Sequence, residues 1–456
     1  MIFEHDFGGY NFPLPVDFSD AILKKPDFSK CTFNASYFRR AETAYPHAPD
    51  ERYAGGFLMS AVFVGTIFDG SVDFWLEDVG DLGFYFSKIV ISEKCPEFYF
   101  DLKSRENDNE KIRSIVVFNE LSLLDTRFYF SISGVNTKVK FKMMDSEFFQ
   151  GNSYVSAQVS SLDFNFLDNK FNKSRFLLEG LNCLEGASCI NFSRNNFNES
   201  ELNIKNIKIL GNIKFYDEKL EKTPVIISEI EVCAYYLSIC SFLDCFYLIQ
   251  HSLFKKIFCI HGVVISSAEE DLRINFRFNS NTILGELCEF SNCTLKVPVS
   301  LSGSRFEGAM KFTGTEFNSI PDLRLTKLGS HFSFDGIKFD SLTSYDSEIE
   351  TSKYKEQSDK YRRLKELAII SKDHDRELEF FASEMRAKRF CEVQKYKKVL
   401  NFFYDKLSDY GRSVGKPVIG LNYIFERNYW IFFSGVHEPN SYYWGEIESK
   451  CEIICG

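Results

Sequence analysis

The chain of 456 residues is long enough for two or three ordinary domains, or for one long repeat array with a cap. Its net charge of −10 argues against wholesale binding to nucleic acid. Phenylalanine occurs 49 times, against 3 tryptophans and 6 methionines, so the excess indicates one recurring type of position rather than general hydrophobicity.

Residues 1–15 are predicted to be a lead-in, and a period of five residues begins directly after them. The sequence then reads VDFSD, AILKK, PDFSK, CTFNA and SYFRR, with a large apolar residue in the middle of each five. A period of five fits neither a helical turn nor the alternation of a strand. It indicates a chain that turns a corner every few residues and points one side chain inward from each side of a coil. These central residues are Phe18, Leu23, Phe28, Phe33 and Phe38.

The fives VDFSD and PDFSK follow the order small residue, Asp, Phe, polar residue. This order resembles the motif of the pentapeptide-repeat proteins. The resemblance implies an all-β fold, a right-handed quadrilateral β-helix with four fives to each coil. Such a solenoid is expected over residues 16–345, with the central residues stacked inside it.

Two segments break the pattern and are expected to be insertions, near residues 41–56 and near residues 93–113. The ladder of large apolar residues returns later, spaced five or six residues apart. An extra residue at a corner, as in a β-bulge, explains the longer steps. The later ladder residues are Phe166, Phe171, Phe176, Phe192, Phe197, Leu202, Phe290, Leu295, Leu301, Phe306, Phe312 and Phe317.

The stretch Val232 to Gln250 allows a second interpretation. It contains a single charged residue, Asp244, and is close to the length of a membrane span. An aspartate near the middle of a span costs about 2.5–3.5 kcal/mol on insertion scales. The solenoid is the favoured interpretation of this stretch, and a transmembrane span is the alternative.

The character of the sequence changes near residue 352, where good helix formers become frequent. Apolar residues at helical spacing predict a helical hairpin over 352–407, which would cap the last coil. Its turn is expected between Ser371 and Asp375, with Ser371 or Asp373 capping the second helix. Residues 408–456 are expected to be a tail.

This region carries a second resemblance. The segments YRRLKELA, DHDRELEFFASEMRAKR and LSDYGRSVGKP resemble the part that joins the solenoid to membrane spans in one bacterial subfamily of pentapeptide-repeat proteins. Some members of that subfamily end in a small ion-channel-like pore domain. Here the apolar run VIGLNYIF after Pro417 is too short to cross a membrane. Truncation or a frameshift is the hypothesis for the missing spans.

No pattern of residues predicts catalysis, and the protein is not expected to be an enzyme. His374 between Asp373 and Asp375 is interpreted as part of a helix start rather than as a metal ligand or base. His251 and His261 lack a recognised ligand spacing. We expect no cofactor and no metal, and reduced thiols rather than disulfides, Cys288 and Cys293 included. These features, together with an N-terminus that does not resemble a signal peptide, favour a cytoplasmic protein.

The function expected from the sequence is that of a non-enzymatic scaffold or protein-interaction module, with a peripheral place at the inner membrane. The partner would be a protein or an anionic membrane surface, without direct binding of nucleic acid and without a small-molecule substrate. The alternative is an acidic solenoid that mimics DNA and binds a topoisomerase or another DNA-binding protein. The basic side chains expected to form the contact surface are Lys360, Arg362, Arg363, Arg386, Lys388, Arg389, Lys395, Lys397 and Lys398.

Overall fold

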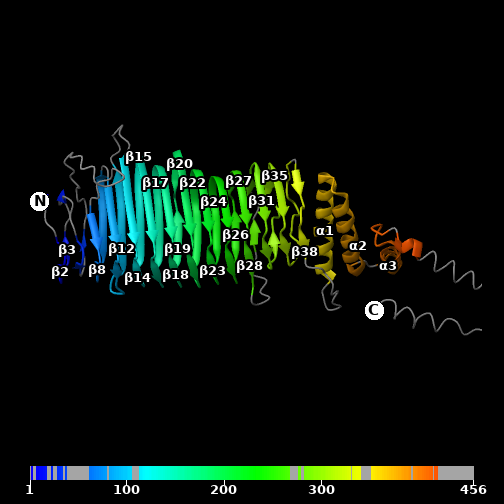
Figure 1. Cartoon of the computed structure of the whole chain (residues 1–456), viewed down its shortest axis with the longest axis horizontal. Helices are drawn as coiled ribbons and strands as arrows, with labels where there is room; N and C mark the ends of the chain where they lie inside the picture. The colour runs from blue at the N-terminus through cyan, green and yellow to red at the C-terminus, as the bar shows by residue number, and fades with distance from the viewer. Residues whose placement is uncertain are drawn as a thin grey trace, which may run out of the picture. The chain divides into compact units, whose positions relative to one another are not determined.

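The computed structural model confirms a β-solenoid followed by helices (Figure 1). The chain divides into two compact units, Met1–Asp346 with Glu366–Lys372, and Ser347–Lys365 with Asp373–Gly456. The residues described are 2–3, 7–17, 22–23, 28–33, 36–37, 61–79, 82–104, 112–267, 276–278, 282–329, 331–339, 351–391, 394–413 and 415–419.

One wall of the solenoid is a 14-stranded parallel sheet of short strands. Each coil contributes one strand of two or three residues to this wall. The strands are β2 (Asn11–Phe12), β5 (Thr32–Phe33), β8 (Ile67–Phe68), β11 (Val90–Ile91), β14 (Ser122–Leu124), β16 (Glu147–Phe149), β18 (Lys170–Asn172), β21 (Asn196–Asn198), β23 (Lys219–Glu221), β25 (Ser241–Leu243), β28 (Val264–Ser266), β32 (Thr294–Leu295), β36 (Glu316–Phe317) and β38 (Lys338–Phe339).

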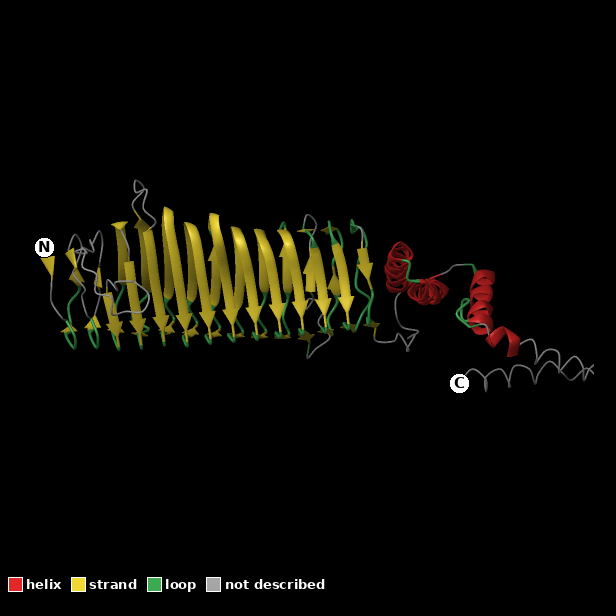
Figure 2. Cartoon of the chain, turned by 45° about the horizontal axis from the view of Figure 1, so that its top comes forward, coloured by secondary structure: helices red, strands yellow, loops and turns green. Residues whose placement is uncertain are grey.

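The remainder of the coils forms a 22-stranded parallel sheet whose middle strands are long and bent (Figure 2). A separate pair joins β1 (Ile2–Phe3) to β4 (Ile22–Leu23). The strands of the large sheet are β3 (Val16–Asp17), β6 (Ser36–Tyr37), β7 (Ala61–Val64), β9 (Val72–Val79), β10 (Leu82–Ser87), β12 (Glu97–Ser104), β13 (Ile112–Asn119), β15 (Arg127–Met144), β17 (Asn152–Leu167), β19 (Arg175–Glu179), β20 (Asn182–Ser193), β22 (Glu201–Tyr216), β24 (Val225–Ser238), β26 (Tyr247–Gln250), β27 (Leu253–His261), β29 (Phe276–Phe278), β30 (Ile283–Leu284), β31 (Leu287–Ser291), β33 (Val299–Ser300), β34 (Arg305–Phe306), β35 (Ala309–Thr313) and β37 (His331–Ser333).

Residues with positive φ make the corners on either side of the short strands. Asp168 (φ 56°) and Lys173 (φ 51°) flank β18, and Arg194 (φ 57°) and Glu199 (φ 48°) flank β21. This left-handed conformation turns the chain sharply at a single residue, so that the chain continues along the next face of the coil. The five-residue spacing in the sequence reflects these paired corners, because a residue that points inward precedes each corner and follows it.

The coils in the middle of the solenoid are longer than four fives. Register partners lie 23 residues apart from Glu147 to Lys170 and 26 residues apart from Arg175 to Glu201. The additional residues belong to long strands such as β17, in which buried and outward side chains alternate. The solenoid therefore combines corners of the five-residue type with a wide wall of long strands.

Aromatic rings at equivalent positions stack through the interior. The ring centroids of Phe148 and Phe171 are 4.6 Å apart, and those of Phe171 and Phe197 are 4.5 Å apart. This distance matches the ~4.8 Å spacing of strands, so one ring per coil fills the core without a gap. The predicted ladder residues that are buried are Phe28, Phe33, Phe166, Phe171, Phe176, Phe192, Phe197, Leu202, Phe290, Leu295, Leu301, Phe306, Phe312 and Phe317. Phe18, Phe38 and the side chain of Leu23 lie outside the described residues.

Three expectations about the solenoid are corrected, and one lies outside the described residues. The lead-in predicted for residues 1–15 is wrong for residues 11–12, which form β2 and pair with β5 in the wall of the solenoid. The insertion predicted near 93–113 is wrong for residues 97–104, which form strand β12 with Phe98, Phe100 and Leu102 buried. The transmembrane alternative for residues 232–250 is also wrong, because this stretch lies in β24, β25 and β26 of the solenoid. The insertion near 41–56 lies outside the described residues.

The C-terminal part contains α1 (Thr351–Ser371), α2 (His374–Cys391) and α3 (Lys395–Ser408). The predicted hairpin corresponds to α1 and α2, and its turn lies at the expected place. Asp373 caps α2, since its Oδ1 accepts a hydrogen bond from the backbone N–H of Arg376 at 3.1 Å. The predicted range 352–407 includes a third helix, α3, that the sequence did not separate. Among the described residues, no helix has both the length and the apolarity needed to cross a membrane.

Candidate functional site

Helix α3 presents apolar side chains to solvent. No residue of this helix is buried, and the exposed fractions of Tyr396 and Leu400 are 62% and 64%. A helix on the surface of a globular protein normally turns its apolar side toward the core. Here the apolar residues recur three or four positions apart and point outward together. The apolar face of α3 consists of Tyr396, Val399, Leu400, Phe403, Tyr404 and Leu407.

The polar side of α3 is the side that packs on α2. Arg389 donates from Nη2 to Oδ2 of Asp405 at 2.8 Å, and Asn401 donates from Nδ2 to the backbone oxygen of Met385 at 2.8 Å. Burial alone would raise the pKa of the Asp405 carboxyl, but the hydrogen bonds and charges of Arg389 and Arg386 outweigh it and lower that pKa. Ion pairing therefore orients α3 so that its apolar face is left uncovered among the described residues.

The segment SDYGRS forms the end of α3 and ties it to α2. Asp409 takes the left-handed conformation (φ 49°) and pairs with Arg386. Tyr410 is 1% exposed, and its hydroxyl accepts a hydrogen bond from Nη2 of Arg389 at 2.7 Å. The motif that carried the second resemblance thus has a structural role, since it fixes the orientation of α3.

A hollow of about 570 Å³ lies between α2 and α3. Its lining combines aromatic and aliphatic side chains with cations, and it adjoins the apolar face of α3. The lining residues are Arg389, Phe390, Lys398, Val399, Phe402 and Phe403. Together, the hollow and the apolar face form one amphipathic surface.

The predicted basic residues fall into two groups. One group forms ion pairs within the helices. Glu384 pairs with Arg362 and Lys388, and Asp405 pairs with Arg386 and Arg389. Asp409 also pairs with Arg386, and Lys360 pairs with Glu356 at 3.1 Å. Arg363 is half-buried. Lys395 and Lys397 are exposed at the borders of the apolar face of α3, and Lys398 is half-buried in the hollow.

Lys406 is a further exposed lysine of α3 that the sequence prediction missed. The sequence prediction also missed the apolar face itself. Apolar residues at helical spacing from Tyr396 to Leu407 were the signal that pointed to it. The prediction of a contact surface rested on basic residues alone and treated the whole helical region as one charged surface.

The histidines weighed for chemistry lie on different elements: His374 begins α2, His261 ends β27, and His251 lies between β26 and β27. No group of three metal-ligating side chains occurs in the described part of the chain. His374 is exposed at the start of α2 and contacts Glu377 at 3.2 Å, while His261 shares a hydrogen bond with Ser291 at 3.0 Å. His251 occupies a corner with φ 48°.

Several cysteines of the solenoid are buried in its interior. Cys288, Cys293 and Cys240 are buried and form no disulfide, and Cys31 is buried as well. Burial raises the pKa of the Cys293 thiol to about 11, so this sulfur stays protonated at neutral pH. A thiol in that state is a poor nucleophile and a poor metal ligand.

Several acidic side chains on the outside of the solenoid pair with basic ones of a neighbouring coil. Lys170 contacts Glu147 at 2.7 Å, and Arg194 contacts Asp168 at 2.6 Å, in each case from the next coil. Lys255 contacts Glu231 at 2.7 Å in the same manner. A mimic of duplex DNA needs continuous rows of negative charge, and pairing of this kind interrupts them. These contacts give the DNA-mimic alternative less support than the scaffold.

No family model, no curated protein and no solved structure matches this chain.

Proposed function

We propose that this protein is a non-enzymatic scaffold of the pentapeptide-repeat type that attaches to an anionic membrane surface through helix α3. The observation that carries the proposal is the orientation of α3. Its polar side is held by Arg389, Asp405 and Tyr410, and its apolar face points away from them. An amphipathic helix with lysines beside an outward apolar face is suited to the boundary between lipid headgroups and acyl chains.

The magnitudes are sufficient for reversible attachment. Burying one large apolar side chain contributes roughly 1.5–3 kcal/mol, and each lysine near an anionic leaflet contributes about 1 kcal/mol. Lys395, Lys397 and Lys406 lie beside the apolar face, where their long stems can keep the ammonium groups at the headgroups. The apolar face and the lysines act together, so neither term has to supply the whole affinity.

The solenoid supplies the scaffold. Its walls are continuous sheets of parallel strands, with outward side chains repeated at each coil. Such a surface offers many equivalent positions to a binding partner, as in other repeat architectures. The five-residue spacing of the corners supports the pentapeptide-repeat type, and the long coils are this chain's departure from that pattern.

Co-sedimentation of the full chain with vesicles tests the attachment. Wild-type protein is expected to pellet with vesicles of phosphatidylcholine and phosphatidylglycerol at low salt, and to pellet less at high salt or without the anionic lipid. Leu400→Ser is expected to weaken binding about tenfold or more, because one large apolar contact is lost. Lys397→Gln is expected to weaken it about fivefold.

The matched control is Leu325→Ser, which changes a leucine of the solenoid that is 84% exposed. This variant is expected to bind as the wild type does. The proposal is overturned by protein that stays in the supernatant with anionic vesicles at low salt. Equal loss of binding in Leu400→Ser and Leu325→Ser would overturn the assignment to α3.

A further inference from the structure

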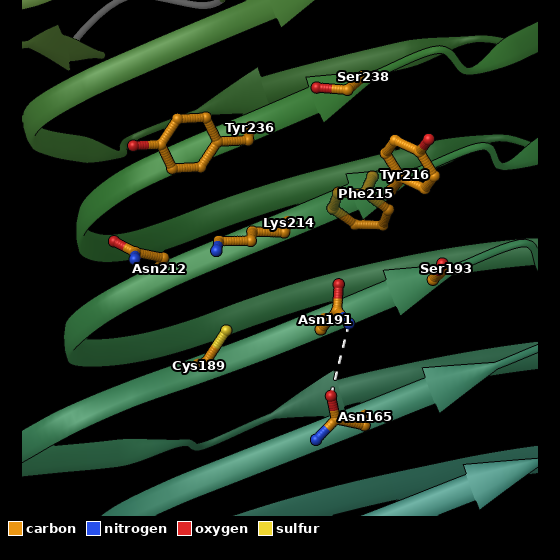
Figure 3. A pocket seen from close by; sticks show the side chains of 10 residues that line it. All are labelled: Asn165, Cys189, Asn191, Ser193, Asn212, Lys214, Phe215, Tyr216, Tyr236 and Ser238. Carbon is orange, nitrogen blue, oxygen red and sulfur yellow. Dashed lines mark hydrogen bonds between the residues drawn. The ribbon is translucent and has the colours of Figure 1, made fainter.

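One row of outward side chains crosses five successive strands on the wide wall of the solenoid. Register pairs Lys142 of β15 with Asn165 of β17, Asn165 with Asn191 of β20, Asn191 with Lys214 of β22, and Lys214 with Tyr236 of β24. Figure 3 shows the last four of these side chains on neighbouring strands. The row therefore runs along the axis of the solenoid, one residue per coil.

A shallow hollow of about 510 Å³ follows this row. Its floor and sides offer hydroxyl and amide groups together with the aromatic ring of Tyr216, which is 47% exposed. Four residues of the row, Asn165, Asn191, Lys214 and Tyr236, line the hollow, and Lys142 continues the row next to Asn165 on β15. The other lining residues are Cys189, Ser193, Asn212, Phe215, Tyr216 and Ser238.

The side-chain amides of the row use only some of their hydrogen-bond donors and acceptors within the described residues. Asn165 donates from Nδ2 to Oδ1 of Asp163 at 2.7 Å, and Asn191 donates from Nδ2 to Oδ1 of Asn165 at 3.4 Å. An asparagine amide offers two N–H donors and an acceptor oxygen. Asn191 thus keeps one N–H and its carbonyl oxygen for a further partner, as far as the hydrogen bonds of the described residues go.

The charges of the row are positive. Lys214 is exposed, and its Nζ lies 5.8 Å from the ring centroid of Tyr236. Lys142 is half-buried. Within the described ranges, neither lysine has a carboxylate at salt-bridge distance, although many other surface cations of the solenoid do. Three strand intervals of ~4.8 Å separate Lys142 from Lys214, which is about 14 Å along the axis.

We propose that this row, which we call the Lys142–Tyr236 trough, binds a linear oligosaccharide that carries carboxylates, such as a chain of uronic acids. Lys142 and Lys214 pair with carboxylates at separate sugars of the chain. Asn165 and Asn191 exchange hydrogen bonds with the sugar hydroxyls between them. Tyr216 offers the apolar face of its ring to a sugar ring. The site is independent of the membrane attachment proposed for α3.

The geometry favours a glycan over a peptide or a nucleic acid. A peptide that adds a strand needs the edge of a sheet, whereas the trough lies on the face of strands whose ladders are already paired. Single-stranded nucleic acid needs successive aromatic platforms for its bases. Four of the five positions in the row are lysine or asparagine. Amides and hydroxyls with a few cations match the surface of an acidic sugar chain.

Isothermal titration calorimetry with the full chain tests the proposal with three probes. The probes are an oligogalacturonate, its methyl ester, which has the same sugars without the charge, and poly-L-glutamate. The oligogalacturonate is expected to bind, with the ester about tenfold weaker because the charge-assisted contacts are lost. Lys214→Gln and Asn191→Ala are each expected to weaken binding of the oligogalacturonate about tenfold.

Lys219→Gln is the matched control, since Lys219 is an exposed lysine on β23 of the same coil, on the short-strand wall beyond the corner at Asp217. It is expected to leave the affinity unchanged. Equal weakening by Lys214→Gln and Lys219→Gln would show a non-specific charge effect and overturn the trough. Absence of binding at millimolar oligogalacturonate overturns it too, as would tighter binding of poly-L-glutamate.

Discussion

Asn195 donates a hydrogen bond from Nδ2 to Oε1 of Glu218 at 3.1 Å inside the solenoid. The same contact recurs one coil earlier, where Asn169 donates to Oδ1 of Asn195 at 2.9 Å. Corner side chains thus form a hydrogen-bonded ladder that ends at Glu218. Its Oε2 is buried and has no hydrogen-bond partner among the described residues. Burial raises the pKa of the Glu218 carboxyl well above its usual value, so this group keeps its proton to a higher pH in the folded protein than in the unfolded chain.

The buried carboxyl of Glu218 is predicted to make the solenoid less stable as the pH rises. The unfolded chain releases this proton near the ordinary pKa of 4.5, while the folded chain retains it. The folded state therefore binds more protons above that pH, and the free energy of unfolding falls by about 1.4 kcal/mol per pH unit until the folded pKa is reached. Glu218→Gln has no such proton, so its stability relative to wild type should increase across this range. Urea unfolding at several pH values measures the difference.

The matched control for Glu218→Gln is Glu221→Gln, at an exposed carboxylate on the same short strand. Its stability should follow that of the wild type with pH. A difference between Glu218→Gln and wild type that stays constant with pH would show that Glu218 is ionised in the folded protein, against the prediction.

Adjacent residues of β16 should differ sharply in their contribution to stability. Phe148 is buried and stacks on Phe171 at 4.6 Å, whereas Phe149 is 41% exposed. Phe148→Ala removes one ring from the interior stack and leaves a cavity, so it is expected to cost about 3–5 kcal/mol. Phe149→Ala is expected to change stability by about 0.5 kcal/mol or less. Urea unfolding followed by circular dichroism compares the two, and similar costs would contradict the stacked core.

The sequence predicts the interior of the solenoid better than its walls. Phe166, Phe171 and Phe176 stand five residues apart because the corners between them place each one inward. The buried positions of the wide wall are harder to predict from the sequence, since small residues such as Ser153 and Ala157 are buried in β17 beside the large ones. A small side chain suffices there because the neighbouring coils already fill the space.

The errors in prediction share a physical cause, which is that neighbours decide exposure. Residues 97–104 alternate as a strand does, but the charged segment after them suggested a loop. The apolar face of α3 has clear helical spacing, yet its outward orientation depends on the pairing of Arg389 with Asp405. A sequence shows which side of a helix is apolar, and only the tertiary contacts show which side is covered.

Gly211 of β22 is predicted to tolerate no side chain. It faces Ser188 of β20, and a Cβ built on Gly211 would lie 1.7 Å from the backbone oxygen of Ser188. The backbones of neighbouring coils must therefore separate to admit a methyl group, so Gly211→Ala is expected to cost about 3 kcal/mol. Gly415→Ala is the control, because nothing lies within 4 Å of its added Cβ. Thermal unfolding should show a lower midpoint for Gly211→Ala alone, and equal midpoints would contradict the close approach.

Glu384 is predicted to make the helical part sensitive to acid. Its side chain is 1% exposed and contacts Arg362 at 3.2 Å and Lys365 at 2.7 Å. Burial alone would raise the pKa of this carboxyl, but the hydrogen bonds and charges of Lys365 and Lys388 outweigh it and lower that pKa below 4.5. The unfolded chain then takes up a proton at a higher pH than the folded chain does. The stabilisation is therefore complete above pH 4.5 and is lost as the pH falls toward the folded pKa.

Glu384→Gln removes the charge that Arg362, Lys365 and Lys388 surround, and it is expected to cost about 1–3 kcal/mol at neutral pH. Its effect should shrink in acid, where the wild-type carboxyl is protonated as well. Hydrogen–deuterium exchange over α1 and α2 reports this locally, because exchange follows the opening of each helix. Glu377→Gln, at a half-buried carboxylate in the first turn of α2 that contacts His374 at 3.2 Å, serves as the control and should leave the exchange of α1 unchanged. Equal protection of α1 in wild type and Glu384→Gln at neutral pH would contradict the stabilisation of the helices by Glu384.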